Sequence, residues 1–450
     1  MKKFWVVLLA LGLVGAFSIT ASAVTFDTSG SYFIRGFYDS NRALTADKES
    51  NTAYGQRLRV KTVLGFTDGL YLTGRFDALE RVWGTNQGES NTVYRLRDRE
   101  YKNHEDQNNI SMDQIYVTFK SPLPFATGVF DVGYMPAGTF GTLFQDEEVD
   151  RARIKYTQSF GRLTLMGYVQ KNNEGSVWRE AGVGPDTGDS DAYNLQGIYK
   201  WQKAEAGIKL CYTNDQSRDE ETAFGGVDYK TQLIYLPVYF KATIDNLYLE
   251  GEASYYGGYD RKYDGDVSDL KRRGYSAYLY GKYNIDRAYV GAQTAFVSGD
   301  DDPNDDVNHS GYDQNKDWNP CLILFEEWLY LYEGDLGGDK AVRRGATTDD
   351  RFNNGWLVQL FGGYNITDKL SVWAALTQAG ADKVAGDQSK NYGTEADIAL
   401  SYQIHPNLNY LIGLGYLWTG KYFDGGGQCD RQTTNNDCVL VNKLELSWGK

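Results

Sequence analysis

The sequence predicts an all-β protein whose strands form one antiparallel sheet closed into a transmembrane barrel. Three observations lead to this fold class: apolar and polar residues alternate along nearly the whole chain, short and long connections take turns between the predicted strands, and a secretory leader precedes them. Alternation gives each strand one apolar and one polar face, and lipid can cover the apolar face of a closed sheet. We expect about eighteen strands, with sixteen as the alternative.

The leader has the features of a secretory signal peptide. Two lysines precede an apolar run from Phe4 to Phe17, and Ala21-Ser22-Ala23 provides the small residues of a cleavage site. We therefore assign 1–23 to a signal peptide and 24–450 to a single barrel domain. After the leader there is no run of about 18 apolar residues, so we expect no membrane-spanning helix.

Composition agrees with a membrane barrel but does not decide the fold class alone. The chain has 35 Tyr, 10 Trp and 50 Gly but only 8 Pro. Tyr and Trp are frequent at membrane interfaces, and Gly serves turns and curved strands. A soluble β-sandwich or β-helix shares these traits, so the arrangement of strands has to separate the alternatives. The formal net charge of -14 argues against nucleic acid as a partner.

The strand pattern itself separates them. The predicted strands are 27–38, 54–67, 70–83, 110–121, 127–136, 148–159, 162–172, 191–201, 204–213, 229–244, 247–259, 273–284, 287–299, 352–366, 370–380, 393–404, 408–420 and 438–448. The short connections lie near residues 68, 123, 160, 202, 245, 285, 368 and 406, and every connection between them is long and polar. Strict alternation puts all short turns at one rim, the periplasmic rim of outer-membrane barrels. A soluble sandwich has no reason to do so.

Turn lengths agree with the phases of the strands. A one-residue slip moves every side chain to the other face, so the apolar residues beside a turn fix whether its length is odd or even. Ile244 and Leu247 require an even turn, and Asp245-Asn246 suits type I′. Phe66 and Leu70 require an odd turn, and Thr67-Asp68-Gly69 places glycine at the left-handed bulge position.

Charged side chains occupy the polar faces. Eighteen strands enclose a lumen too wide for side chains to fill, so water must enter it. The predicted channel-lining residues are Arg57, Arg59, Lys61, Arg75, Asp77, Asp131, Arg151, Arg153 and Lys155. The odd turn at 68 puts Lys61 opposite Arg75 and Arg59 opposite Asp77. Basic rungs on one wall and acids on the opposite wall would set a transverse field; charges scattered to keep the lumen polar are the alternative.

Two long connections are candidates for narrowing the lumen. The first follows Pro136, is rich in Gly and ends acidic; its candidate constriction residues are Phe140, Asp146, Glu147 and Glu148, and an ordinary surface loop is the alternative. The second spans 300–351 and contains the run 321–332, which is too apolar for bare solvent. We expect it to pack into the mouth as a lid or plug, or to contact a neighbouring protomer.

The four cysteines of an exported chain favour disulfides over metal binding. Cys429 and Cys438 are the candidate disulfide, since they bracket one Gly- and Asn-rich stretch, whereas Cys211 and Cys321 can pair only if the fold brings them together. The acidic run 300–306 lacks the glycine and closing glutamate of an EF-hand, so we interpret it as a solvated loop. We expect no metal site and no cofactor.

In these features the chain resembles the Gram-negative outer-membrane porins. The resemblance is carried by the leader, the alternating rims, the inward-loop candidate after Pro136, and the charged ladders Arg57-Leu58-Arg59-Val60-Lys61 and Arg151-Ala152-Arg153-Ile154-Lys155. The strand count is closer to substrate-selective porins and alginate-export-type barrels than to sixteen-stranded general porins.

The resemblance implies a water-filled channel in the outer membrane for passive diffusion of small hydrophilic solutes or ions. Its surroundings would be outer-membrane lipid, and the resemblance implies a homotrimer. A substrate-selective or polysaccharide-export channel and a barrel sheath for a partner protein are the alternatives. We expect no enzyme activity, because the three histidines fall in predicted connections and no GxSxG, HExxH or phosphate-binding motif occurs.

Overall fold

The computed structural model describes residues 24–41, 44, 50–83, 110–123, 126–145, 149–174, 188–216, 229–263, 266–302, 305–311, 318–325, 352–384, 386–424 and 435–449. These residues form one sheet of 19 strands and one 3-10 helix, η5 (Lys421–Phe423). None of the helical structure in this part of the chain is long and apolar enough to cross a membrane.

The strands follow one another along the chain with few irregular interruptions. They are β1 (Thr25–Asp39), β2 (Asn51–Thr67), β3 (Leu70–Val82), β4 (Ile110–Lys120), β5 (Val129–Met135), β6 (Arg151–Phe160), β7 (Leu163–Asn173), β8 (Ser190–Lys200), β9 (Ala204–Asp215), β10 (Tyr229–Ile244), β11 (Leu247–Tyr263), β12 (Leu270–Ile285), β13 (Ala288–Val297), β14 (Val307–Asn308), β15 (Gly355–Asn365), β16 (Leu370–Ala381), β17 (Asn391–His405), β18 (Leu408–Thr419) and β19 (Asp437–Trp448).

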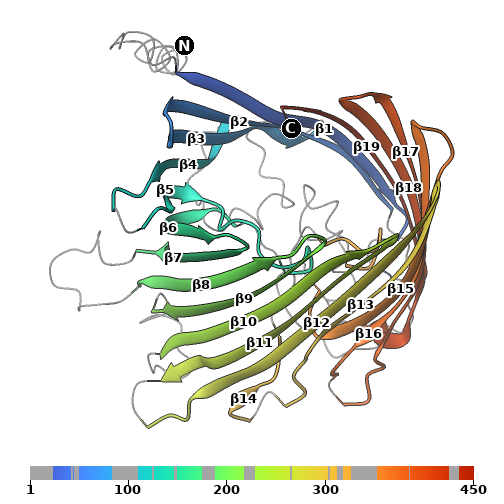
Figure 1. Ribbon diagram of the computed structural model, residues 1–450. Helices are drawn as coiled ribbons and strands as arrows, with labels where there is room; N and C mark the ends of the chain where they lie inside the picture. Colours follow the sequence, from blue (N-terminus) through green and yellow to red (C-terminus); the bar gives the residue numbers. More distant parts are fainter. Residues whose placement is uncertain are drawn as a thin grey trace.

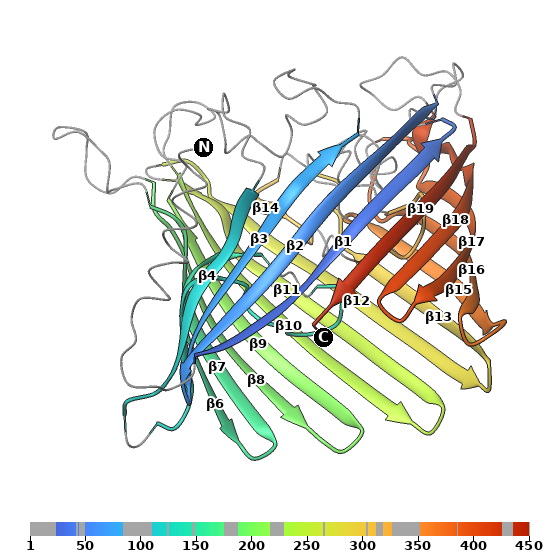
Figure 2. The same ribbon diagram turned by 90° about the horizontal axis from the view of Figure 1, so that it is seen from above.

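The sheet closes on itself to form a barrel, as Figures 1 and 2 show. Each long strand pairs antiparallel with its neighbours in the chain, β13 pairs with β15, and β1 pairs with both β2 and β19. The 19 strands include β14, a two-residue strand that lies beside β12 in parallel, so the barrel wall has eighteen. The predicted count of eighteen is confirmed and the alternative of sixteen is wrong. The short β14 is a feature that alternation does not predict, because two residues carry no period.

The two rims differ as predicted. Short turns join the strand ends at one rim, and the connections at the opposite rim are long. Ile244 pairs with Leu247 across a two-residue turn in which Asp245 has a φ of 50°, as type I′ geometry requires. Gly69 has a φ of 82° beside a register shift between Gly65 and Thr67, so the predicted bulge is present.

The two faces of the wall also differ as predicted. Leu195 on β8 is 61% exposed and points outward, whereas its neighbour Gln196 is 4% exposed and points into the barrel. The register carries this division from strand to strand: Gln196 pairs with Lys209, and Leu195 pairs with Leu210. An exposed apolar outer surface that surrounds the barrel is stable only in lipid, so the wall has the surface of an outer-membrane barrel.

We predict that a charge on the outward face destabilises the barrel according to its depth. Leu195→Arg lies in the middle of β8 and should lower the free energy of unfolding by about 2–4 kcal/mol, because it places a cation in hydrocarbon. Ile244→Arg is the control, since Ile244 is equally outward and 58% exposed but ends β10 at the rim, where we expect about 0–1 kcal/mol. Guanidinium unfolding in lipid vesicles measures both values; equal losses would contradict the lipid-facing assignment.

Candidate functional site

The connection after β5, one of the two candidates for narrowing the lumen, folds into the barrel. Figure 1 shows this teal segment inside the ring of strands. Thr142 anchors it, because its backbone N–H and its hydroxyl both donate to Glu252 Oε2 on β11, at 2.6 and 2.7 Å. Gly141 allows this approach: its φ is 86°, and a Cβ there would lie 2.8 Å from the carboxylate oxygens of Glu252. The segment is therefore held against the inner wall by a buried carboxylate.

Gln145 forms the second anchor of this segment. Its Nε2 donates to Ser276 Oγ on β12 at 2.6 Å, and its Oε1 accepts from Tyr235 OH on β10 at 3.1 Å. The same amide also hydrogen-bonds Tyr256 and Ser254 of β11, so it ties the segment to three strands. The neighbouring candidates Asp146, Glu147 and Glu148 lie outside the described residues.

Arg153 holds the base of the same segment. Its guanidinium donates to the carbonyl oxygens of Met135 and Val149, which lie at the two ends of the connection, and to Gln170 Oε1 at 2.7 Å. The side chain is only 5% exposed. Arg153 was predicted as a lining residue, but two of these three hydrogen bonds hold the connection, so its position is that of a structural clamp.

A second segment, 318–325 of the long 300–351 connection, also packs inside the barrel. Glu395 on β17 fixes it: Oε1 accepts the N–H groups of Leu322 and Ile323 at 3.0 and 2.7 Å, and Oε2 accepts that of Leu324 at 2.7 Å. Glu395 is 0% exposed. The expectation that this connection enters the mouth is confirmed for these eight residues, while 326–351 lie outside the described residues.

The two segments meet through aromatic rings. Phe144 of the first segment stacks on Tyr278 of β12 at 5.0 Å between ring centroids and makes an edge contact with Trp318 of the second segment at 4.9 Å. Phe140, the remaining predicted constriction residue, is 4% exposed and packs edge-on against Tyr239 of β10. We call residues 136–145 and 318–325 together the inner shelf. Its contacts run along the inner faces of β9 to β12 and β15 to β19.

The cysteines do not form the second pairing considered from the sequence. Cys211 on β9 and Cys321 in the inner shelf are both free. Cys321 is buried, and burial raises the pKa of its thiol well above the ordinary value. The candidate disulfide of Cys438 involves Cys429, which lies outside the described residues.

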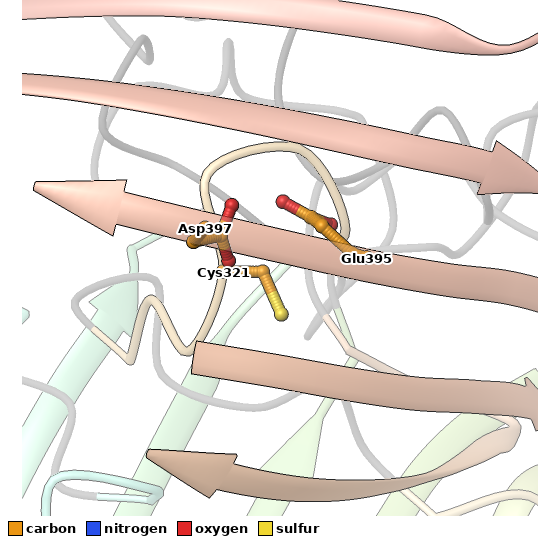
Figure 3. A group of neighbouring side chains, drawn as sticks. All are labelled: Cys321, Glu395 and Asp397. Carbon is orange, nitrogen blue, oxygen red and sulfur yellow. The ribbon is translucent and has the colours of Figure 1, made fainter. Parts of the chain in front are cut away.

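Cys321 does lie beside two carboxylates, as Figure 3 shows. The Cys321 sulfur and one carboxylate oxygen each of Glu395 and Asp397 lie within 4.8 Å of one another. Among the described residues, this group is the one whose spacing would suit a metal ion. Both oxygens of Glu395 already accept backbone N–H groups. We therefore assign this carboxylate to holding the shelf.

Opposite this covered side, β2 to β6 carry a network of ion pairs. Arg59 binds Asp77 at 2.6 Å and Asp113 at 3.3 Å, and Arg75 binds Asp150 at 2.6 Å. The predicted register is confirmed, since Arg59 pairs with Asp77 and Lys61 with Arg75. We define the charged wall as the inward side chains Arg57, Arg59, Lys61, Arg75, Asp77, Asp113, Asp131, Asp150, Arg151 and Lys155.

The carboxylates of the charged wall stand beside its cations. Lys155 binds Asp131 at 3.2 Å, and Arg57 lies 3.9 Å from Asp77. The sequence hypothesis placed acids on the wall opposite the basic rungs; these carboxylates instead neutralise the rungs locally. Among the described residues, Lys61 makes no ion pair. It lines a polar cavity of about 730 Å³, together with Arg59, Arg75 and residues of β18 and β19.

Two members of the charged wall, Asp113 and Asp150, are absent from the sequence prediction. Strict alternation turns Asp113 outward, but a register shift in β4 opposite Arg75 and Phe76 brings it to the inner face. Asp150 was placed in a strand beginning at 148, whereas β6 begins at Arg151 and Asp150 accepts from Gln114 Nε2 at 2.9 Å. One signal in the sequence could have found them: arginines on a buried surface need acidic partners nearby.

No protein-family model matches the sequence, and no curated protein matches it. Its fold, however, is similar to solved structures. Pseudomonas aeruginosa OccK9 (OpdG) aligns with a TM-score of 0.52 at 14% identity, covering 94% of this chain and 99% of that one. The fold is that of an outer-membrane porin. A BenF-like porin from Pseudomonas fluorescens aligns over 94% of this chain and 99% of its own, with a TM-score of 0.50 and 14% identity. OpdK from Pseudomonas aeruginosa, solved with vanillate, has the same coverage, TM-score and identity.

We predict that Glu395→Gln loosens the inner shelf of this porin fold. Gln has one acceptor oxygen, so its NH2 group would face one of the three backbone N–H donors, at a cost of about 1–3 kcal/mol. Hydrogen exchange at Leu322, Ile323 and Leu324 should speed up by about tenfold or more.

Glu445→Gln is the matched control. Glu445 also lies on the inner face, but it pairs with Lys443 at 2.8 Å and hydrogen-bonds no described residue of the shelf. Equal exchange rates in the two variants would contradict the anchoring role of Glu395.

Proposed function

We propose that this protein is an outer-membrane porin, a water-filled channel for passive diffusion of small hydrophilic solutes and ions. The observation that carries the proposal is the division of the lumen. The inner shelf covers one side of the wall, and the ion-paired charged wall lines the other. Solutes then pass between the inner shelf and the charged wall, where the channel is narrowest.

The residues that line this passage favour anions. The carboxylates Asp77, Asp113 and Asp150 are each engaged by an arginine, whereas Lys61 makes no ion pair among the described residues and borders the polar cavity. An uncompensated cation in a confined aqueous space raises the local anion concentration. The channel is therefore weakly anion-selective, although the whole chain carries a net charge of -14.

A substrate-selective channel is the second candidate. OpdK was solved with vanillate, a small organic anion, and its fold resembles this one. A carboxylate-bearing solute would suit the charged wall. A sheath for a partner protein is less favoured, because the inner shelf occupies part of the lumen that a partner would need.

The remaining assignments complete the proposal. The leader 1–23, which lies outside the described residues, directs export, and outer-membrane lipid covers the outward face. A homotrimer stays a prediction.

We predict that Lys61→Gln reduces the preference for anions. The permeability ratio of Cl⁻ to K⁺ should fall by about two- to fivefold at low salt, because one lumen charge is removed, and the effect should shrink in 1 M salt. Reversal potentials across a planar bilayer with a KCl gradient give the ratio. Arg287→Gln is the control, since Arg287 lies in a turn and is 59% exposed. An unchanged ratio in Lys61→Gln would refute the lining assignment.

Acidification should increase the anion preference. Burial raises the pKa of Asp150, with Arg75 and Gln114 acting in the opposite direction. Asp150 becomes neutral as the pH falls through this raised pKa, and Arg75 then loses a neutralising partner.

Asp150→Asn should therefore show the higher anion preference already at neutral pH and a smaller pH response. Asp68→Asn, in an exposed turn, is the control. The same reversal-potential measurement between pH 7 and pH 4 checks both variants. A pH response in Asp150→Asn as large as in the wild type would count against this role.

A further inference from the structure

Four aromatic side chains form a continuous band on the inner wall, between the inner shelf and the short-turn rim. Tyr248 lies 6.2 Å from Tyr280 between ring centroids, Tyr280 lies 5.1 Å from Phe361, and Phe361 lies 6.4 Å from Tyr289. They come from β11, β12, β15 and β13. We call these four residues the aromatic stripe.

The stripe lies on the inward face of the wall. Tyr280 pairs in register with Glu250 and Gln293, which belong to the inward face. Phe361 lies across Gly291, where a Cβ would come within 2.3 Å of its Cζ, and Tyr289 lies across Gly363 in the same way, also at 2.3 Å. Because Gly291 and Gly363 leave space beneath them, the rings of Phe361 and Tyr289 cover the backbone of the wall, and Tyr280 stacks on Phe361.

The stripe begins directly beneath the constriction. Tyr278, which stacks on Phe144 of the inner shelf, is two residues from Tyr280 on the same face of β12. Tyr248 lies two residues beyond the short turn that follows β10. A solute that has passed the shelf therefore meets the stripe before it reaches the short-turn rim.

Hydrogen-bonding groups border the rings. Tyr248 OH donates to Glu250 Oε2 at 2.7 Å, Gln293 Nε2 donates to Gln359 Oε1 at 2.6 Å, and Lys282 Nζ lies 5.5 Å from the centroid of Tyr289. The wall thus combines aromatic rings with carboxylate, amide and ammonium groups beside them.

Phe361 and Tyr289 each cover a glycine of the neighbouring strand, which explains their positions. This packing role does not explain Tyr248 and Tyr280. Phe361 is 8% exposed, whereas the three tyrosines remain partly exposed to the lumen. Apolar ring faces in water favour a ligand with an apolar face of its own. A sugar ring has such a face in its axial C–H groups, which form weak contacts with aromatic rings, and its hydroxyls suit the polar groups alongside. The Glu250 carboxylate disfavours an aromatic acid at the same place.

We propose that the aromatic stripe is a binding surface for the pyranose rings of small carbohydrates that pass through the channel. The inference rests on the proposed porin function and names a solute class for it. Because the aromatic rings follow one another along the wall, they can contact successive sugar units of one oligosaccharide.

The test uses the full-length mature protein in a planar bilayer, with maltotriose as the probe. We expect maltotriose to interrupt the ionic current transiently and in proportion to its concentration. In the double variant Tyr280→Leu/Tyr289→Leu the apparent Kd should rise about tenfold, since two stacking contacts are removed. Tyr289→Phe keeps the ring and should keep the binding.

Tyr275→Leu is the matched control, because Tyr275 belongs to β12 but points outward and is 54% exposed. Each variant is used only if its conductance in KCl without sugar matches that of the wild type, which shows that the barrel is folded and open. Two comparison probes are used: sodium benzoate, and a polyethylene glycol of the same size as maltotriose.

Absence of current interruptions by maltotriose, or interruptions unchanged in the double variant, would overturn the proposal. Interruptions by benzoate alone would overturn it as well and assign the stripe to aromatic acids. A protein that conducts no ions at all would instead refute the porin function, so the two failures are distinguishable.

Discussion

In lipid, a backbone amide without a hydrogen-bond partner costs several kcal/mol, and closure of the sheet between β1 and β19 is what removes this cost. Closure also fixes the register of every strand. Once Gly30 pairs with both Val60 and Trp448, a slip of one residue anywhere would turn an inward face outward. The outward apolar surface and the charged lumen are consequences of this single constraint.

The closed wall then requires something to narrow it, because eighteen strands leave a wide lumen. The two segments of the inner shelf narrow it, and two buried carboxylates on the inner face hold them by accepting their backbone N–H groups. Glu252 holds Thr142, and Glu395 holds residues 322–324. Backbone N–H donors satisfy a buried carboxylate without a second charged side chain. The anchors at Glu252 and Glu395 therefore need no arginine of the charged wall.

The sequence predicts most of the wall and only part of the interior. Alternation and turn chemistry are local, so the strands, the rims and the pairing of Arg59 with Asp77 can be derived from them. Asp113 could not be placed, because a bulge shifts the alternation by one residue and no local signal marks it. The anchoring role of Glu395 could not be predicted either, since its partners lie more than seventy residues away in the 318–325 segment.

The measurement that tests the central claim most directly is a spin-label scan along one strand. Single nitroxide labels at positions 193 to 198 of β8, in a cysteine-free background reconstituted in lipid vesicles, report collisions with oxygen and with a water-soluble nickel complex. The account predicts that 193, 195 and 197 collide preferentially with oxygen, which concentrates in lipid, and that 194, 196 and 198 do not. An accessibility profile without this two-residue period would contradict it.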